Sequence, residues 1–316
     1  MSTVIKSIYI GILILILGFT IAFSESHVVT ETLDFVISDD GTGVLKVKRL
    51  VRVEDERGKS LGKVQFQDNK YTDTKNIEAR LLDQNMKIVK KLKKKDIEQY
   101  KGASSYGTYI DYTFLAFELS STSLPYYVEY SYVKEYRSLF FWGQWFPESD
   151  FLVKESIYRL TAPKNFQYRI QRIGGDIDST YDPKSNTVTW KLTDIPAFED
   201  EYRMCPEDED RFGILFVPLK YELDGAGSTE TWNDLGSWCR NLYDGVYDLK
   251  DESLAEIGLP EFSNAGEIVS TAFRYIQEKT HYVLINPGIH GWKPHSAQSI
   301  FDNKYGDCKD LATLLI

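Results

Sequence analysis

Cysteine is scarce in this sequence, and basic residues are outnumbered by acidic ones. The chain has three cysteines in 316 residues, Cys205, Cys239 and Cys308. An odd number means that at least one thiol stays free or pairs with another molecule. A bond between Cys205 and Cys239 would leave Cys308 free. Three separate thiols are the alternative, because pairing cannot be read from sequence.

The deficit of positive charge narrows the range of partners. Lysine and arginine total 37 against 47 aspartates and glutamates, which gives a formal net charge of -10. Because an acidic chain repels phosphates, we predict no nucleic-acid binding. The acidic stretch FEDEYRMCPEDEDRFG (198–213) lacks the regular ligand spacing of a calcium loop. We therefore expect a solvated loop there, and no metal site.

The sequence also lacks an apolar run long enough for an ordinary membrane-spanning helix. Ile8–Phe23 is an uncharged, mostly apolar run of 16 residues, whereas a spanning helix needs about 20. Small residues at Ala22 and Ser24 fit the positions that a signal peptidase reads. We therefore expect residues 1–24 to be a signal peptide, with cleavage before Glu25 and export to the periplasm or cell surface. An uncleaved membrane anchor is the alternative.

The next part of the sequence is rich in β-forming residues. LDFVISDDGTGVLKVKRLVRV (33–53) has the pattern of a hairpin around an Asp/Gly turn. Further β-rich runs are PYYVEYSYVKEY (125–136), SIYRLTAPKNFQYRI (156–170) and NTVTWKLTDI (186–195), with turn-forming clusters between them. No repeat is visible. We predict an antiparallel, β-sandwich-like domain over residues 25–227.

Two stretches within this region have unusual composition. KIVKKLKKKDIEQYKG (87–102) places six lysines between Lys87 and Lys95. We expect a solvated helix or strand face there, with a lipid- or polyanion-binding patch as the alternative. FFWGQWFPESDF (140–151) is the densest aromatic stretch. It favours core or inter-domain packing, and a surface that stacks on sugars or peptides is the alternative.

After the small residues at 225–228 the period changes from strand to helix. One apolar face recurs at steps of three and four along STETWNDLGSWCRNLYDGVYDL (228–249), at Trp232, Leu235, Trp238, Leu242 and Val246. We place a domain boundary at this point, and residues 228–316 form the second predicted domain.

Three further elements are expected in the second domain. NAGEIVSTAFRYIQEKT (264–280) predicts a helix, with Asn264 as N-cap and Glu267 completing a capping box. HYVLI (281–285) predicts a short strand, and SAQSIFDNK (296–304) a short helix.

The last stretch, NKYGDCKDLATLLI (303–316), places a cysteine at the start of a predicted helix. Asp307 fits an N-cap, so Cys308 lies in the first turn. Unpaired backbone N–H groups and the helix dipole stabilise a thiolate there. Lys309 adds a positive charge, while Asp307 and Asp310 oppose it. Gly306 allows the backbone of a partner or substrate to approach. A buried, inert cysteine is the alternative on local chemistry alone.

The surrounding residues carry a resemblance. TWNDLGSWCRNL (231–242) and FRYIQEKTHYVLINPGIHGWKPHSAQSIFDNKYGDCKDLATLL (273–315) together resemble bacterial transglutaminase-like proteins. In these proteins an uncharacterised β-rich domain precedes a papain-type cysteine domain. The expected class is therefore α+β multidomain, with a β-sandwich-like domain before the helical N-terminal half of a papain-like, transglutaminase-like domain. YGDCKDLATLL is similar to the family's nucleophile motif, which implies that Cys308 is the nucleophile.

The resemblance implies acyl transfer by a Cys-His-Asp triad on a protein or peptide substrate, without a cofactor. The family's His and Asp follow the nucleophile helix, so we expect this chain to be incomplete at its C-terminus and inactive alone. The four histidines present, His27, His281, His290 and His295, do not match the triad position.

Two other residues are candidates for the oxyanion donor that such chemistry needs. Trp292 precedes the nucleophile helix as a tryptophan does in related transglutaminases, and Gln298 is the rival by analogy with papain-like enzymes.

The resemblance leaves two reactions open, hydrolysis and transamidation. The alternative function is a non-catalytic binding or assembly module of the cell envelope that acts through its β-rich domain.

Overall fold

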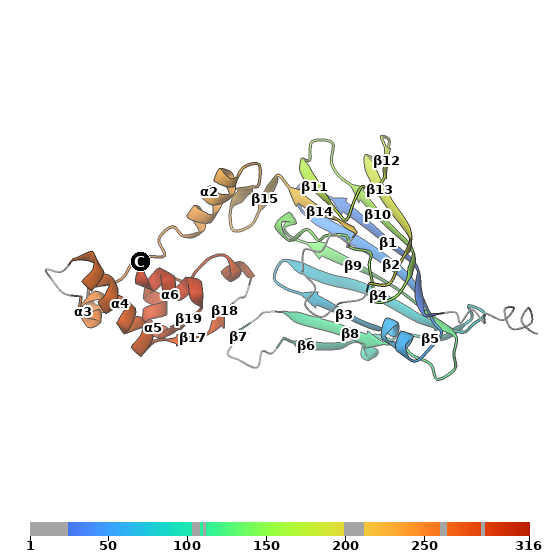
Figure 1. The fold of residues 1–316 in the computed structure, drawn as a ribbon, viewed down its shortest axis with the longest axis horizontal. Coiled ribbons are helices and arrows are strands. Elements are labelled where there is room, and N and C mark those ends of the chain that lie inside the picture. Colours follow the sequence, from blue (N-terminus) through green and yellow to red (C-terminus); the bar gives the residue numbers. More distant parts are fainter. Residues whose placement is uncertain (1–24, 103–107, 110–111, 199–211, 260–263, 286–287) are drawn as a thin grey trace, which may run out of the picture.

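The computed structural model describes residues 25–102, 108–109, 112–198, 212–259, 264–285 and 288–316. These residues form a β-rich body and a smaller, mainly helical unit that extends from one end of it (Figure 1). The predicted signal peptide (1–24), Cys205 and most of the acidic stretch lie outside the described residues. Among the described helices, none has both the length and the apolar character to span a membrane.

An eight-stranded sheet forms the centre of the β-rich body. Its strands, in spatial order, are β12 (Ser179–Asp182), β13 (Thr187–Ile195), β10 (Val153–Thr161), β1 (His27–Ile37), β2 (Gly43–Val53), β9 (Tyr126–Tyr136), β4 (Thr72–Leu82) and β5 (Ile88–Lys91). The predicted hairpin is confirmed, since β1 and β2 pair antiparallel from His27↔Arg52 to Ile37↔Gly43.

The prediction of an antiparallel fold is wrong for one strand pair. β1 and β10 run parallel, with Val28 opposite Val153 and Val36 opposite Thr161. A parallel pair needs a long crossover connection, and here the connection contains β2 to β9. The sheet is therefore mixed.

Two smaller sheets cover one face of the large sheet. The first pairs β11 (Tyr168–Ile173) with β14 (Gly213–Pro218) and brings Ile214 and Phe216 onto the large sheet. The second contains β3 (Lys63–Asp68), β8 (Thr113–Glu118) and β6 (Glu98–Lys101), and packs Phe66 and Phe117 onto the other half of the same sheet. The body thus has two cores beneath one sheet, which agrees with a layered β architecture.

The aromatic stretch 140–151 contributes to both expected kinds of packing. Trp142 and Trp145 are buried in the first core, and the Trp145 indole N–H donates to the Ser156 hydroxyl over 3.1 Å. Phe140 instead contacts Trp238 and Trp292 of the helical unit, with ring centroids 5.3 and 5.2 Å apart. The stretch therefore joins the core to the inter-unit contact.

The helical unit confirms most of the predicted elements. Its helices are α2 (Trp232–Leu242), α3 (Asp251–Ile257), α4 (Ala265–Lys279), α5 (Ala297–Asn303) and α6 (Cys308–Leu315). HYVLI forms two short strands, β17 (His281–Tyr282) and β18 (Leu284–Ile285), and β19 (Tyr305–Gly306) pairs with β17. Asn264 caps α4 by accepting from the Glu267 N–H, but the predicted capping box is incomplete, because none of the described hydrogen bonds joins the Glu267 side chain to the Asn264 N–H.

Three details of the helical unit differ from the sequence prediction. Trp232 is 87% exposed, so the apolar face of α2 begins only after its first turn. α3 was not expected, because only two of its seven residues are large and apolar. Residues 225–228, expected to be a flexible boundary, belong to a hairpin of β15 (Lys220–Glu222) and β16 (Ala226–Ser228).

This hairpin connects the two parts of the molecule. Tyr221 and Leu223 are buried against Trp238 and Leu242 of α2, and the Trp238 indole N–H donates to the Leu223 carbonyl over 3.1 Å. A second link pairs β18 in parallel with β7 (Thr108–Tyr109) of the β-rich body. The helical unit is therefore held to the body at two places.

Candidate functional site

The start of α6 has the geometry that its sequence predicts. The Asp307 carboxylate accepts hydrogen bonds from the backbone N–H groups of Lys309 and Asp310 over 3.1 and 3.2 Å. Asp310 completes a capping box by accepting from the Asp307 N–H over 3.2 Å. Cys308 is exposed and carries a free thiol. The cap therefore fixes the first turn of the helix and leaves the thiol accessible.

Asp310 holds this turn in place from the buried side. Its side chain is fully buried and also accepts from the His295 backbone N–H over 2.9 Å. The His295 ring nitrogen Nδ1 lies 3.3 Å from the same carboxylate. A side chain at Gly306 would place its Cβ 2.6 Å from the Asp310 Cβ. The close approach that Gly306 allows is thus the approach of Asp310.

Lys309 does not direct its charge to the thiol as expected. Its ammonium group forms an ion pair with the Asp307 carboxylate, and both side chains are largely buried. This pairing neutralises the cation within the cap. The remaining positive potential at Cys308 comes from the helix N-terminus itself.

Tyr282 is a neighbour of Cys308 that sequence reasoning missed. β17 and β19 pair in parallel with Tyr282 opposite Gly306, and the Val283 N–H donates to the Gly306 carbonyl over 3.0 Å. This register brings the Tyr282 ring beside the start of α6, although the two residues are 26 positions apart.

The hydroxyl of Tyr282 is coupled to Cys308. Burial of the hydroxyl raises its pKa most, and the nearby Cys308 side chain raises it further. The Cys308 backbone N–H has the opposite effect and lowers the pKa. Tyr282 as a whole is 61% exposed, so its hydroxyl lies at the surface next to the thiol. The cap uses the amides of Lys309 and Asp310 and leaves the Cys308 amide unused.

Trp292 lies in the contact between the two parts of the molecule. Its ring contacts Phe140 edge-on and Trp238 at a centroid distance of 5.8 Å. It follows the short 3-10 helix η4 (Gly288–Gly291), and its backbone N–H donates to the Ile289 carbonyl over 2.7 Å. The residue is still 43% exposed. Packing therefore accounts for its position, and its role as oxyanion donor stays a prediction.

The Gln298 amide is engaged by α3. Its oxygen accepts from the Lys250 N–H over 3.0 Å, and its nitrogen donates to the Ser253 hydroxyl and the Asp302 carboxylate over 3.0 and 2.7 Å. An amide nitrogen has two protons, and both are used. Gln298 fastens α3 to α5 and has no donor left for an oxyanion in this arrangement.

Two of the four histidines lie beside the buried side of α6. His290 and His295 stack with ring centroids 4.1 Å apart. Burial lowers the pKa of His290 most, and the neighbouring His295 lowers it further. None of the described hydrogen bonds or ion pairs joins a histidine to Cys308. His27 is buried in the β-rich body, and its ring contacts the Glu25 carbonyl over 2.7 Å.

The other described cysteine has a different environment. Cys239 on α2 is a free, partly buried thiol whose pKa is raised by burial. A thiol of this kind is inert compared with an exposed thiol at a helix start. Among the residues that the structure describes, no cluster of His, Cys, Asp and Glu could hold a metal ion.

The fold is similar to that of one solved structure over most of the chain. A crystal structure from Parabacteroides distasonis ATCC 8503, named as a "putative protease", matches with a TM-score of 0.67 at 15% identity. The match covers 93% of this chain and 58% of that one, so this chain spans little more than half of its structural relative. At this identity the likeness concerns the fold alone.

Other matches are much weaker. Aminopeptidase A of Legionella pneumophila has a TM-score of 0.27 at 11% identity, with 62% of this chain and 22% of that chain covered. An M1 zinc metallopeptidase of Deinococcus radiodurans has 0.28 at 10%, with 74% and 52% covered. Scores this low support no argument about fold or activity. No protein with a curated description matches the sequence.

The profile of one protein family matches residues 39–199, just over half of the chain. This range begins in the turn before β2 and ends after β13, so it lies within the β-rich body. The chain belongs to the family of domains of unknown function with a solved structure, DUF3857.

Proposed function

We propose that Cys308 is the nucleophile of an acyl-transfer reaction on a peptide or amide carbonyl. The observation that supports this most is the exposed thiol in the first turn of α6, which the Asp307–Asp310 capping box holds in place. The thiol at this position lies at the positive end of the helix dipole, beside the Cys308 backbone N–H that the cap leaves unused. The resemblance of residues 303–315 to a transglutaminase-like nucleophile motif points to the same chemistry.

In the proposed step, the Cys308 sulfur attacks the carbonyl carbon and forms a thioester. The bond from that carbon to the amide nitrogen breaks, and the amine leaves after it receives a proton. Water then yields hydrolysis, or a second amine yields transamidation. The proton must pass through a general base and acid. We infer that neither His290 nor His295 has this role, because the His290 ring contacts the Lys293 carbonyl and the His295 ring contacts the buried Asp310 carboxylate.

Two donors beside Cys308 are suited to hold the developing oxyanion. The Cys308 backbone N–H is not used by the helix cap, and the Tyr282 hydroxyl lies next to it. Two donors that converge on one point form the usual oxyanion arrangement, and each contributes substantially to the rate. Trp292 stays as the competing side-chain donor.

This function can be tested with an activated acyl donor. We expect 4-nitrophenyl acetate to transfer one acetyl group to Cys308 and to release nitrophenolate, as seen by mass spectrometry of the peptide that contains the label. Cys308→Ala should lose the burst of nitrophenolate, and Cys239→Ala should keep it. Equal acetylation of Cys239, or an unchanged burst in Cys308→Ala, would contradict the assignment. That result would favour the non-catalytic binding module.

Export is proposed on the sequence alone. The motivation is the apolar run Ile8–Phe23 followed by small residues. N-terminal sequencing of protein recovered from the producing cell tests it. A chain that still begins at Met1 in the soluble cytoplasmic fraction would rule export out.

A further inference from the structure

Six lysines of the β-rich body form a cluster of cations without partners. They are Lys87, Lys90, Lys91, Lys93, Lys94 and Lys95. All six are exposed, and among the described residues none of their ammonium groups forms an ion pair with a carboxylate. We call this group the lysine cluster.

Several lysines elsewhere on the large sheet are paired with carboxylates. Lys48 pairs with Glu129 over 3.1 Å, Lys75 pairs with Glu135 over 2.5 Å, and Lys191 pairs with Glu155 over 2.5 Å. These cross-strand pairs neutralise charge on the open face of the sheet. The lysine cluster is thus a local excess of positive charge on a chain whose net charge is -10.

Protection of the sheet edge explains only part of this cluster. β5 is an edge strand, and lysines on an edge strand hinder pairing with other chains. This accounts for Lys90 and Lys91, which lie on β5. It does not account for Lys93–Lys95, which follow the strand, or for Lys87, which precedes it.

Exposed apolar side chains accompany the lysines. Met86, Ile88 and Val89 are 48%, 43% and 62% exposed, and they lie in the turn before β5 and at its start. Residues 84–91 form an uninterrupted exposed segment. Cations interleaved with exposed aliphatic side chains are typical of surfaces that bind at a lipid interface.

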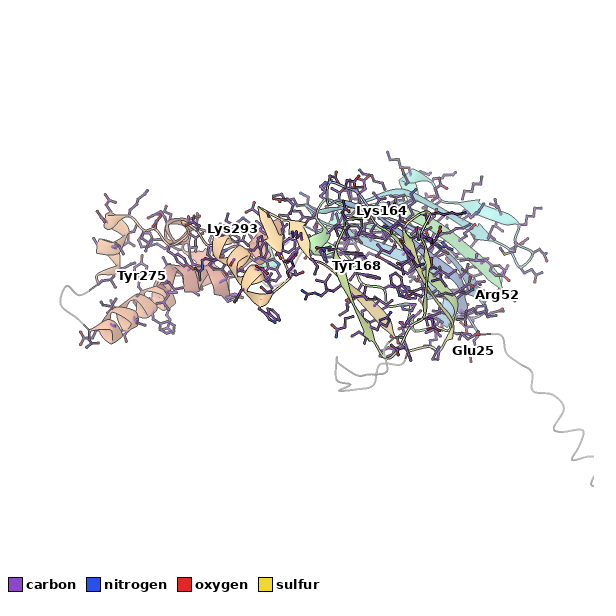
Figure 2. The ribbon with its side chains drawn as sticks, turned by 90° about the horizontal axis from the view of Figure 1, so that it is seen from above. Glu25, Arg52, Lys164, Tyr168, Tyr275 and Lys293 are labelled. Carbon is purple, nitrogen blue, oxygen red and sulfur yellow. The ribbon has the colours of Figure 1, made fainter. Side chains whose placement is uncertain are left out.

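The lysine cluster begins at the rim of the sheet where the described chain starts. Strand register links one row of residues across five strands, from His27 through Arg52, Tyr127 and Leu82 to Ile88. Neighbouring strands lie about 4.8 Å apart, so His27 and Ile88 are separated by roughly 19 Å. Figure 2 shows Glu25 and Arg52 at the end of the body that is far from the helical unit.

We propose that this rim and the adjoining β5 edge form a docking surface for an anionic lipid bilayer. The lysine cluster would lie against the lipid headgroups, with Met86 and Val89 at the level of the interface. Each lysine near an anionic surface contributes about 1 kcal/mol, which is about fivefold in partitioning. The acidic remainder of the molecule would be repelled, so the surface would orient the helical unit and Cys308 away from the membrane. The proposal is independent of the reaction at Cys308.

Vesicle sedimentation tests the surface directly. The protein from Glu25 onward, which contains every described element, would be mixed with vesicles of phosphatidylcholine alone or with phosphatidylglycerol. We expect binding only to the anionic vesicles, and loss of that binding in 0.5 M salt. Lys90→Gln, Lys91→Gln, Lys93→Gln and Lys94→Gln combined should lower partitioning at least about tenfold.

A matched variant controls for net charge. Lys154, Lys164, Lys184 and Lys220 are also exposed and have no ion-pair partner among the described residues, and changing these four to Gln should leave partitioning nearly unchanged. An equal loss in both variants, or no binding to anionic vesicles, would overturn the proposal. Cluster-dependent binding to heparin without vesicle binding would overturn it as well, because the surface would then serve a soluble polyanion.

Discussion

At the level of single residues, Tyr282 is the neighbour of Cys308 that the sequence did not predict. The sequence around Cys308 indicates a capped helix start, but it contains no sign that a phenol from β17 lies beside the thiol. That contact depends on the parallel pairing of β17 with β19. Pairing between separated segments is not encoded in local spacing, so the residue could not have been found from the sequence.

Tyr282→Phe should slow the reaction of Cys308 with iodoacetamide at neutral pH. The hydroxyl is a donor beside the cysteine, whose side chain raises the tyrosine pKa after burial, and loss of one neighbouring donor corresponds to roughly three- to tenfold in rate. Alkylation followed by peptide mass spectrometry measures this. Tyr305→Phe is the matched control, because Tyr305 is exposed on the neighbouring β19 and forms no hydrogen bond with Cys308 among the described residues. Equal rates in Tyr282→Phe and wild type would exclude the contact.

His290 predicts a pH dependence of stability for the helical unit. Burial lowers its pKa below the ordinary value of 6.5, and His295 and Lys309 lower it further, while the Lys293 carbonyl and Asp310 oppose this. Between the folded and the unfolded pKa, the unfolded chain binds more protons. Stability is therefore lost as the pH falls below about 6.5.

Urea unfolding at pH 7.5 and pH 5.5 measures this effect. The wild type should be less stable at pH 5.5, by at most about 1.4 kcal/mol for each unit by which the pKa is lowered. His290→Gln cannot titrate, so its two midpoints should lie closer together. A pH effect of the same size in His290→Gln would attribute it to another group.

At the level of elements, the termini of α4 and α6 were predictable because caps are local. Asn264 precedes α4, and the Asp307–Asp310 spacing places the start of α6 at Cys308.

α3 was missed because its packing is not periodic. Its buried residue is Ser253, which is held by Gln298 from a helix 45 positions away in the sequence. Trp232 followed the apolar period of α2, but no neighbour covers the first turn.

Asp310→Ala should destabilise the start of α6. The fully buried carboxylate accepts from the backbone N–H groups of Asp307 and His295, and removing it leaves those donors without a partner. Unsatisfied buried donors cost about 1–3 kcal/mol each. The lower unfolding midpoint should appear in urea titrations followed by circular dichroism. Glu278→Ala on the exposed side of α4 should change the free energy of unfolding by less than about 0.5 kcal/mol. Similar midpoints for both variants would show that Asp310 does not hold the helix.

At the level of the whole molecule, strand content was predictable and strand connection was not. The runs 125–136 and 186–195 contain the strands β9 and β13. The parallel pairing of β1 with β10 joins Val28 to Val153, and no sequence pattern encodes a partner 125 positions away. The lysine stretch 87–102 was correctly expected to be exposed, and the aromatic stretch 140–151 was correctly expected to be packed. Both were predictable because charged side chains favour water and aromatic side chains favour burial.

Phe140→Ala should loosen the helical unit from the β-rich body. The ring contacts Tyr221, Trp238 and Trp292, and truncating a partly buried phenylalanine costs about 2–4 kcal/mol. Limited proteolysis should then cut the variant between the two parts faster than the wild type. Phe273→Ala is the control, because Phe273 on α4 is 50% exposed. An unchanged rate of cleavage would mean that the Phe140 ring does not hold the unit to the body.

The proposed acyl-transfer function requires that the start of α6 activates Cys308. The measurement that tests it most directly is the second-order rate of alkylation of Cys308 by iodoacetamide at pH 7. N-acetylcysteine in the same solution serves as the unperturbed thiol, and Cys205 and Cys239 serve as internal references. We predict that Cys308 reacts faster than N-acetylcysteine and faster than both other cysteines, because its exposed thiol lies at the positive end of the α6 dipole. A rate equal to or below that of N-acetylcysteine would contradict its assignment as the nucleophile.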